Sequence, residues 1–362
     1  MAYTNIDDPS EHFNTILYSG NSGNPRSLTG VGFKPDFLWV KRRNAAERHL
    51  LTNAQMGVES GAYKWLDSSD TADDFGGGYG VASFDTDGFT FKGVDATWNA
   101  SSNTYVAWNW KANGGTTASN TDGSITTTTQ VNSDAGFSIV TWAGGGTGTL
   151  GHGLGETPDM WIIKNRDYAV SWAVGFSDSN ILGGRSKYLS LNTTGAISTY
   201  NNFWGTSDGQ ISSTTIGAAG DRTINISGND YVGYFFKAKQ GYSKFGKYIG
   251  NGNADGPFAY TGFKPAFLMI KNSSGGVGHW TMYDNKRAAT NLNNKKLAAN
   301  LAEAENDNAQ LGGDAYGIDF LSNGFKIRLT GNNHNVSAAT YIFMAFAENP
   351  LVTSTGVPTT AR

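Results

Sequence analysis

The six residues GTGTLG, from Gly146 to Gly151, have the spacing of the glycine-rich loop that binds the phosphates of a dinucleotide. That loop needs a helix directly after it, because the helix N-terminus holds the pyrophosphate. Here the next residues are HGLGETPDMWII, in which a proline marks the start of an apolar strand. The pattern therefore predicts a hairpin loop, and we expect no cofactor.

The acidic and imidazole side chains do not form a recognisable chemical motif either. The acidic stretches at 67–75 and 84–88 lack the EF-hand spacing, so they are interpreted as solvated loops, with calcium binding left open. A carboxylate pair for glycoside hydrolysis also stays open, because such residues meet only in the folded chain. No pair of histidines has the short spacing typical of zinc ligands. The histidines are His12, His49, His152, His279 and His334. We assign no catalytic and no metal-binding residue, and the expectation is that the protein is not an enzyme.

Aromatic side chains are the remaining candidates for recognition, because their rings can stack on sugars or pack on a partner. They make up 13% of the chain. Those outside the most apolar segments are predicted to lie on loops, where binding residues are common. The leading candidates are Trp98, Trp204, Trp280 and Tyr283. The alternative is that these rings seal contacts between units or subunits.

The composition narrows the classes of protein to consider. The 362 residues carry a net charge of −3, which gives no reason to expect a nucleic-acid partner. There is no cysteine, which favours folding in a reducing cytosol, and no apolar run is long enough to span a membrane. The 48 glycines, with many polar turn residues and aromatics, are typical of turn-rich β-structure.

A motif that could position such residues occurs three times. GFKPDFLWVKRR at 32–43 is matched by GETPDMWIIKNR at 155–166 and GFKPAFLMIKNS at 262–273. The proline presets the backbone at a strand start, and the four apolar residues after it need burial on both faces. We therefore predict a central strand in each copy. Trp39, Trp161 and Met269 are expected at equivalent buried positions.

A second landmark follows each copy at a nearly constant distance. The segments TYVAWNWKA, DYVGYFFKA and TYIFMAFAE carry tyrosines that lie 70, 73 and 76 residues after the three prolines. These tyrosines, Tyr105, Tyr231 and Tyr341, are predicted core residues together with Trp39 and Trp161. The first and third copies also share a hairpin signature at 80–91 and 317–327, with Asp-Gly or Asn-Gly near its turn. The second copy lacks it.

The spacing of short strands and turns predicts an all-β fold of three tandem antiparallel β-sandwich units, of jelly-roll or concanavalin-like type, with little helix. The first unit is expected over 1–112, the second over 135–240 and the third over 241–350. A linker rich in Gly, Ser, Thr and Asn, 113–134, is expected to be extended or flexible.

Two further segments carry local expectations. Residues 351–362 form a polar tail that is expected to become ordered only by docking on another subunit or protein. Residues 294–306 contain strong helix formers, but their counterparts in the other copies resemble a strand followed by a loop. We expect residues 296–300 to be extended, with at most two helical turns after them.

The repeated GFKPDFLWVKRR…TYVAWNWKA pattern and the two ends of the chain resemble structural proteins of tailed bacteriophages, especially marine and cyanobacterial phages. The ends are MAYTNIDDPSEHFNTILYSGN and FMAFAENPLVTSTGVPTTAR. The resemblance covers nearly the whole chain and marks a repeated fold more than a function. It implies a tail-fibre-like virion protein, assembled in the bacterial cytoplasm, with concanavalin-like or SPRY-like sandwiches.

The leading hypothesis is thus a virion protein, such as a tail fibre, neck or capsid appendage, that acts in particle assembly or host-surface attachment. Its expected partners are copies of itself, with a trimer favoured, other virion proteins and a host surface glycan. Nucleic acid and membrane insertion are not expected. A carbohydrate-binding module of lectin type is the alternative, and a polysaccharide depolymerase is a third hypothesis.

Overall fold

The computed structural model describes residues 3–182, 184–274, 278–305 and 317–359, which fold mainly as antiparallel strands. Helix among these residues is limited to one α-helix, α1 (Ser179–Leu182), and two 3-10 turns, η1 (Pro9–Glu11) and η2 (Asp208–Gln210). The predicted all-β fold with little helix is confirmed.

The first unit contains a main sheet and a smaller sheet. The main sheet has the order β1 (Phe13–Ser19), β9 (Thr104–Trp110), β3 (Phe37–Arg42) and β4 (His49–Asn53). The smaller sheet has the order β2 (Arg26–Thr29), β8 (Gly88–Lys92) and β7 (Gly80–Asp85). A separate short pair is formed by β5 (Val58–Glu59) and β6 (Ala62–Tyr63).

The second unit has a wider main sheet. Its order is β10 (Ala118–Asn120), β11 (Thr127–Asn132), β12 (Phe137–Ala143), β19 (Asp230–Phe236), β14 (Met160–Asn165), β15 (Ala173–Phe176), β16 (Lys187–Ser190) and β17 (Ser198–Thr199). The smaller sheet pairs β13 (Gly148–Gly151) with β18 (Thr215–Ala218), so GTGTLG includes an edge strand. Because β10 and β11 belong to the sheet, the segment 113–134 is part of the second unit and not a free linker.

The third unit repeats the plan of the first. Its main sheet has the order β20 (Ser243–Ile249), β27 (Thr340–Pro350), β22 (Phe263–Asn272), β23 (Thr281–Asp284) and β24 (Leu297–Ala298). Its smaller sheet has the order β21 (Phe258–Tyr260), β26 (Gly324–Ile327) and β25 (Ile318–Leu321). The hairpins β7–β8 and β25–β26 are those predicted from the Asp-Gly and Asn-Gly signatures. Of residues 296–300, which were expected to be extended, 297–298 form β24 and 299–300 form a turn, and 301–305 is not helical. Any helix after 305 would lie outside the described residues.

The three main sheets share one strand order, which explains the two sequence landmarks. In each unit the strand that carries the apolar run after the motif proline, which we call the proline-initiated strand (β3, β14 or β22), pairs with the tyrosine strand (β9, β19 or β27), which also pairs with β1, β12 or β20. The expected strand start at the proline is wrong for the third unit, because β22 begins at Phe263 and Pro265 is its third residue, at a register shift. The tyrosine hydroxyls have a repeated role. The Tyr105 Oη accepts from Ala100 N at 3.1 Å and donates to Ala96 O at 2.9 Å, and Tyr231 and Tyr341 bond equivalent backbone groups. Each tyrosine thus fixes the loop before its own strand.

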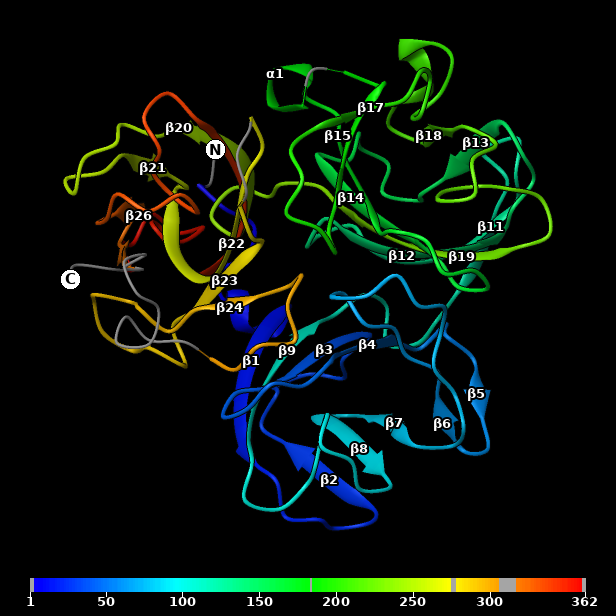
Figure 1. Cartoon of the computed structure of the whole chain (residues 1–362), viewed down its shortest axis with the longest axis horizontal. Coiled ribbons are helices and arrows are strands. Elements are labelled where there is room, and N and C mark those ends of the chain that lie inside the picture. Colours follow the sequence, from blue (N-terminus) through cyan, green and yellow to red (C-terminus); the bar gives the residue numbers. More distant parts are fainter. Residues whose placement is uncertain (1–2, 183, 275–277, 306–316, 360–362) are drawn as a thin grey trace.

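Each proline-initiated strand is buried on both faces. In β3, Phe37 and Trp39 enter a core shared by all three units, which we call the central core, whereas Leu38 and Val40 face the first unit's smaller sheet. The same alternation sends four residues of β14 and β22 into the central core: Met160, Ile162, Phe267 and Met269. Figure 1 shows the result, three lobes arranged around a common centre. Because the units share this core, each one covers the inner faces of the other two.

The predicted equivalence of three apolar residues is wrong for one of them. Trp39 and Met269 both lie in the central core, but Trp161 lies in the second unit's own core. Trp39 lies two residues before the motif lysine, Lys41. The residue two before the matching Lys164 is Ile162, so Ile162 and not Trp161 is equivalent to Trp39. Successive strand residues point to opposite faces, so a register error of one residue transfers the side chain to the other core.

The units contact one another in a fixed cyclic sense. The lysine at the next-to-last position of each proline-initiated strand is fully buried, and its ammonium donates to a backbone carbonyl of a neighbouring unit. The contacts are Lys164 to Thr71 O at 3.1 Å, Lys271 to Thr194 O at 2.9 Å, and Lys41 to Ala302 O at 3.1 Å. The second unit thus contacts the first, the third contacts the second, and the first contacts the third.

Backbone hydrogen bonds repeat the same cycle two residues further along. The carbonyl oxygens of Arg166, Ser273 and Arg43 accept from the N–H groups of Asp74, Ile197 and Glu305 at 3.0, 3.1 and 2.7 Å. The side chains of Trp172 and Trp280 follow the same sense, with their Nε1 atoms donating to Asp67 O and Ser190 O. The chain therefore closes on itself, with all three contacts between units made inside one molecule.

The C-terminal tail docks on the chain's own N-terminal segment, which corrects the expectation that it needs another protein. Ser354 donates through its N and Oγ to the carboxylate of Asp7, at 2.6 and 2.5 Å. Leu351 N donates to Gly262 O, and a bridge joins Val352 to Pro358. The part of the tail that the structure describes, to residue 359, is thus folded against the first and third units.

We expect the buried lysines to make stability depend on alkaline pH. Burial lowers the pKa of Lys164 to about 8, from its ordinary 10.5. Between these values the unfolded chain binds more protons, so stability rises with pH there. The unfolding free energy of the wild type minus that of Lys164→Met should therefore rise from pH 8 to 10.5 in urea titrations. Lys244→Met, at an exposed position of β20, is the control substitution, and a flat Lys164 curve would contradict the prediction.

Candidate functional site

The four aromatic residues predicted for recognition are not on the surface. Trp98 and Trp204 lie in the first and second units' own cores, Tyr283 lies in the third unit's core, and Trp280 lies in the central core. Their exposed fractions are 4%, 0%, 0% and 2%. A buried ring cannot stack on a ligand, so the recognition role is corrected. Trp280 matches the alternative, because its Nε1 donates to Ser190 O across the contact between the second and third units.

The histidines have structural surroundings. His49 accepts from Trp39 Nε1 through Nδ1 at 2.9 Å, which leaves Nε2 to donate to Ala298 O and Leu301 O. Burial lowers the pKa of His49 and His334 to about 3 and that of His152 to about 4. These rings are therefore neutral at physiological pH and serve as fixed hydrogen-bonding groups.

The acidic stretch 67–75 is also used within the fold. Asp67 accepts from the backbone N of His49 and Ser69, and Asp74 forms ion pairs with Lys64 and Arg166 at 3.0 and 2.9 Å. Over the described ranges, no three His, Asp or Glu side chains are grouped in a way that could hold a metal ion. Among the same residues, no helix has the length and apolarity needed to cross a membrane.

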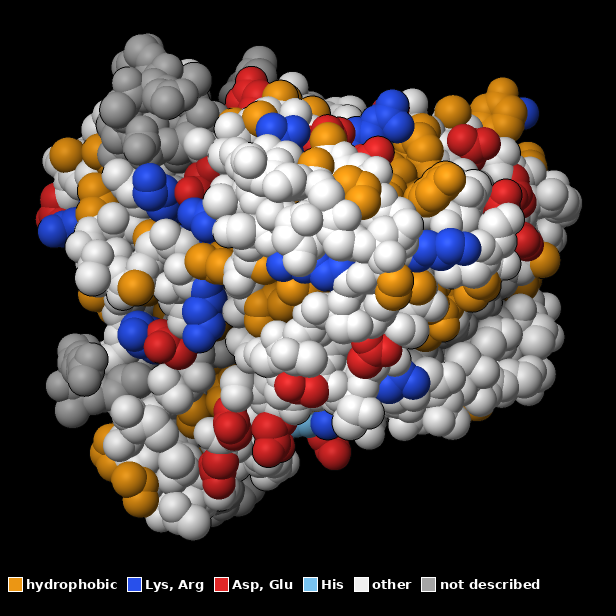
Figure 2. Space-filling view, turned by 90° about the horizontal axis from the view of Figure 1, so that it is seen from below, with side chains coloured by type: hydrophobic (Ala, Val, Ile, Leu, Met, Phe, Trp, Pro, Cys, Tyr) orange, Lys and Arg blue, Asp and Glu red, His pale blue; other side chains and the backbone are white. Residues whose placement is uncertain are grey.

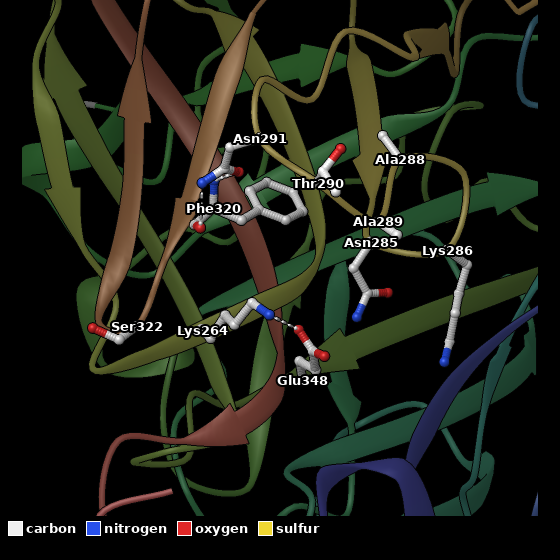
Figure 3. A pocket seen from close by; sticks show the side chains of 10 residues that line it. All are labelled: Lys264, Asn285, Lys286, Ala288, Ala289, Thr290, Asn291, Phe320, Ser322 and Glu348. Carbon is white, nitrogen blue, oxygen red and sulfur yellow. Dashed lines mark hydrogen bonds and ion pairs between the residues drawn. The ribbon is translucent and has the colours of Figure 1, made fainter. Parts of the chain in front are cut away.

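A cavity in the third unit is the best-defined candidate site. We call it the third-unit cavity, and its volume is about 380 Å³. It lies between β22 and the end of β27 on one side and the β25–β26 hairpin on the other, with the loop 285–291 along its rim (Figure 3). Its lining includes Lys264, Asn285, Lys286, Phe320 and Glu348. A volume near 300 Å³ or above is typical of ligand pockets.

The cavity is polar, and its charges are partly paired. Lys264 Nζ lies 2.7 Å from Glu348 Oε2, at the base of the view in Figure 3. Asn285 lines the cavity with its side-chain amide, whose oxygen, Oδ1, is buried and has no hydrogen-bond partner among the described residues. Phe320 and two alanines, Ala288 and Ala289, add apolar wall. The cavity thus offers a carboxylate, an amide, an ammonium group and an apolar surface in one place.

The third-unit cavity arises from a residue difference in the repeated motif. After the motif proline, the first two copies have Asp36 and Asp159, which accept from the backbone N of Ala112 and Ala238 at 2.7 Å and turn the chain toward the next unit. The third copy has Ala266 there. In this copy β27 continues to Pro350, and Glu348, near its end, lies beside Lys264.

Sequence reasoning missed the residues of this cavity. The change from PDF and PDM to PAF was visible in the aligned copies, and it was the one available signal. Its meaning depends on what the lost aspartate does, which is a contact 76 or 79 residues away in the chain. Asn285 and Glu348 lie outside the repeated motif and carry no pattern of their own.

The surface seen from below has no single dominant charge. Figure 2 shows lysine and arginine side chains interspersed with aspartate and glutamate, and hydrophobic side chains in small groups between them. On the third unit, the outward residues of β21, Phe258 and Tyr260, are 43% and 55% exposed. These two rings, unlike the predicted four, are accessible to solvent.

Comparison with known proteins places the chain in a family without assigning an activity. Residues 8–350 match the family described as Domain of unknown function (DUF7483), so the chain belongs to that family. No curated protein and no solved structure matches the chain. The match includes all three units and ends at the last residue of β27.

Proposed function

We propose that this protein is a structural component of a bacteriophage particle, acting in particle assembly, host-surface attachment or both. The observation that carries the proposal is the closed arrangement of three units around the central core. Such an arrangement provides a rigid block, while the loops at the ends of the sheets differ between units and stay available for contacts. The resemblance to tail-fibre-like proteins supports the same role.

Self-association, with a trimer favoured, is part of the proposal. Because the inner faces of the main sheets already pack on one another within one chain, a trimer would have to use outer surfaces. Sedimentation velocity of the purified protein tests this directly, since a monomer of 38.6 kDa and a trimer separate clearly. A monomer at all concentrations would remove self-association from the proposal.

Localisation in the particle is the deciding test. An antibody against the purified protein should label intact particles at one defined structure in electron microscopy, and the protein should remain with particles through a density gradient. A protein found only in the soluble fraction of the infected cell would contradict the proposal.

Glycan binding is the second candidate function, and the third-unit cavity is the observation that favours it. Amide, carboxylate and ammonium groups beside an aromatic ring are the groups that orient hydroxyl-rich ligands. The two functions are compatible, because a virion protein that attaches to a host surface needs such a site.

A further inference from the structure

We propose that the third-unit cavity binds one sugar-sized unit of a glycan, with a preference for an acidic sugar. This inference rests on the attachment role proposed above and assigns it a place and a ligand class. The cavity volume of about 380 Å³ is near the lower end for ligand pockets, which suits a compact unit better than a long chain.

The carboxylate in the wall points to a ligand that donates hydrogen bonds. Glu348 is an acceptor at both oxygens, and only Oε2 lies against Lys264. Asn285 also lines the cavity, and its side-chain amide carries two N–H donors. A carboxylate acceptor beside an amide donor suits the hydroxyl groups of a sugar, each of which can donate and accept.

The start of the loop 285–291 offers no donors to a phosphate ligand. A phosphate site normally presents several free N–H groups or an arginine. At the start of the loop, the N–H groups of Lys286 and Arg287 both donate to Asp284 Oδ1, and that of Asn285 donates to Ala266 O. The Arg287 guanidinium is fully buried and bonded to Asp284 and Glu305. These donors are therefore unavailable.

The rim supplies the preference for an acidic sugar. Lys286 is exposed and forms no ion pair with the described residues, whereas Lys264 is paired with Glu348. Among the described lining residues, Lys286 is therefore the cation whose charge is not paired with a carboxylate. A sugar carboxylate at the rim would meet Lys286, while the apolar face of the ring would contact Ala288, Ala289 and Phe320.

Saturation-transfer NMR and calorimetry on the full chain test the assignment with glucuronic acid, glucose and sulfate as probes. We expect binding of glucuronic acid with a Kd on the order of 1 mM, weaker binding of glucose and none of sulfate. Lys286→Ala should reduce the affinity for glucuronic acid roughly twofold to fivefold and leave that for glucose unchanged. Sulfate binding as tight as that of glucuronic acid would show an unspecific anion site and overturn the proposal.

Variants of the wall separate binding from folding. Asn285→Ala removes the amide that lines the cavity, so it should weaken the binding of both sugars roughly twofold to tenfold, with the melting temperature as the check on folding. Ala289→Trp should fill the cavity and abolish binding. The matched controls are Ser177→Ala, at the equivalent place in the second unit, and Lys244→Ala on β20. Loss of binding in either control, or unchanged binding in Ala289→Trp, would overturn the assignment.

The two proposals fail in different ways. Protein that is located in particles but binds neither sugar contradicts the ligand assignment and leaves the structural role intact. Protein that binds the sugars but is absent from particles contradicts the structural role and leaves the cavity assignment intact.

Discussion

Replacing Trp39 by alanine should lower the unfolding free energy by roughly 3–5 kcal/mol, because a large ring is removed from a packed core. Trp39 is 3% exposed and packs edge-on against Trp108, with 6.1 Å between ring centroids. Its loss also leaves His49 Nδ1 buried without the donor that Trp39 Nε1 provides at 2.9 Å. Because the cavity opens in the central core, all three units should lose stability together.

Denaturant unfolding with tryptophan fluorescence and circular dichroism measures the effect. Trp39→Phe keeps most of the volume and should cost less, while Tyr79→Ala, at a position 59% exposed, should stay within about 0.5 kcal/mol of the wild type. A Trp39→Ala midpoint equal to that of the wild type would show that the site is not core. Separate unfolding transitions for the three units would show that the units do not share one core.

Replacing Glu305 by alanine should cost roughly 3–5 kcal/mol, because it removes one partner from a buried charge network. Glu305 accepts from Arg43 through both of its oxygens at 2.9 Å and lies 3.2 Å from Arg287, whose side chain is fully buried. The Arg43 pair joins the first unit to the third. Without Glu305, two guanidinium groups remain, and among the described residues of the network Asp284 is their one counter-charge.

The acid dependence gives this prediction a second readout. Burial alone would raise the pKa of Glu305, but the bonds and charges of Arg43 and Arg287 outweigh it and hold the pKa below its ordinary 4.5. The contribution is therefore complete above pH 4.5 and is lost as the pH falls through the lowered value. The stability gap between wild type and Glu305→Gln should shrink in that range. Glu156→Gln, in an exposed pair with Lys239, should cost less than about 1 kcal/mol.

The sequence allowed the strands to be predicted better than their surroundings. Pro-initiated apolar runs and tyrosine strands identified β3, β14 and β22 with their partners, because such runs need burial on both faces. A run that is apolar on both faces does not indicate what covers each face, so the central core could not be predicted. The segment 113–134 looked like a linker because its strands, ASN at 118–120 and TTTQVN at 127–132, contain no apolar run.

The candidate site was less predictable than the fold. Trp98, Trp204 and Trp280 lie outside the most apolar runs, yet each is buried with its Nε1 bonded to a backbone carbonyl oxygen. Sequence does not reveal such acceptors, because they come from segments that meet only in the folded chain. The sequence signal for the third-unit cavity is that Ala266 stands where the other two copies have an aspartate. The other feature of the cavity, the extension of β27 to Pro350, is seen only in the folded chain.

The cyclic contacts between units have a consequence for how such a protein can change in evolution. An open array of repeats can gain or lose a repeat at its end, because each repeat touches only its neighbours and the ends are capped separately. Here the first unit contacts the third through Lys41 and Arg43, so there is no end at which to add a copy. A fourth unit would have to open this contact, and a two-unit chain would expose the inner faces of both sheets. The number of units is therefore fixed by closure, and variation is confined to the loops and to places such as the third-unit cavity.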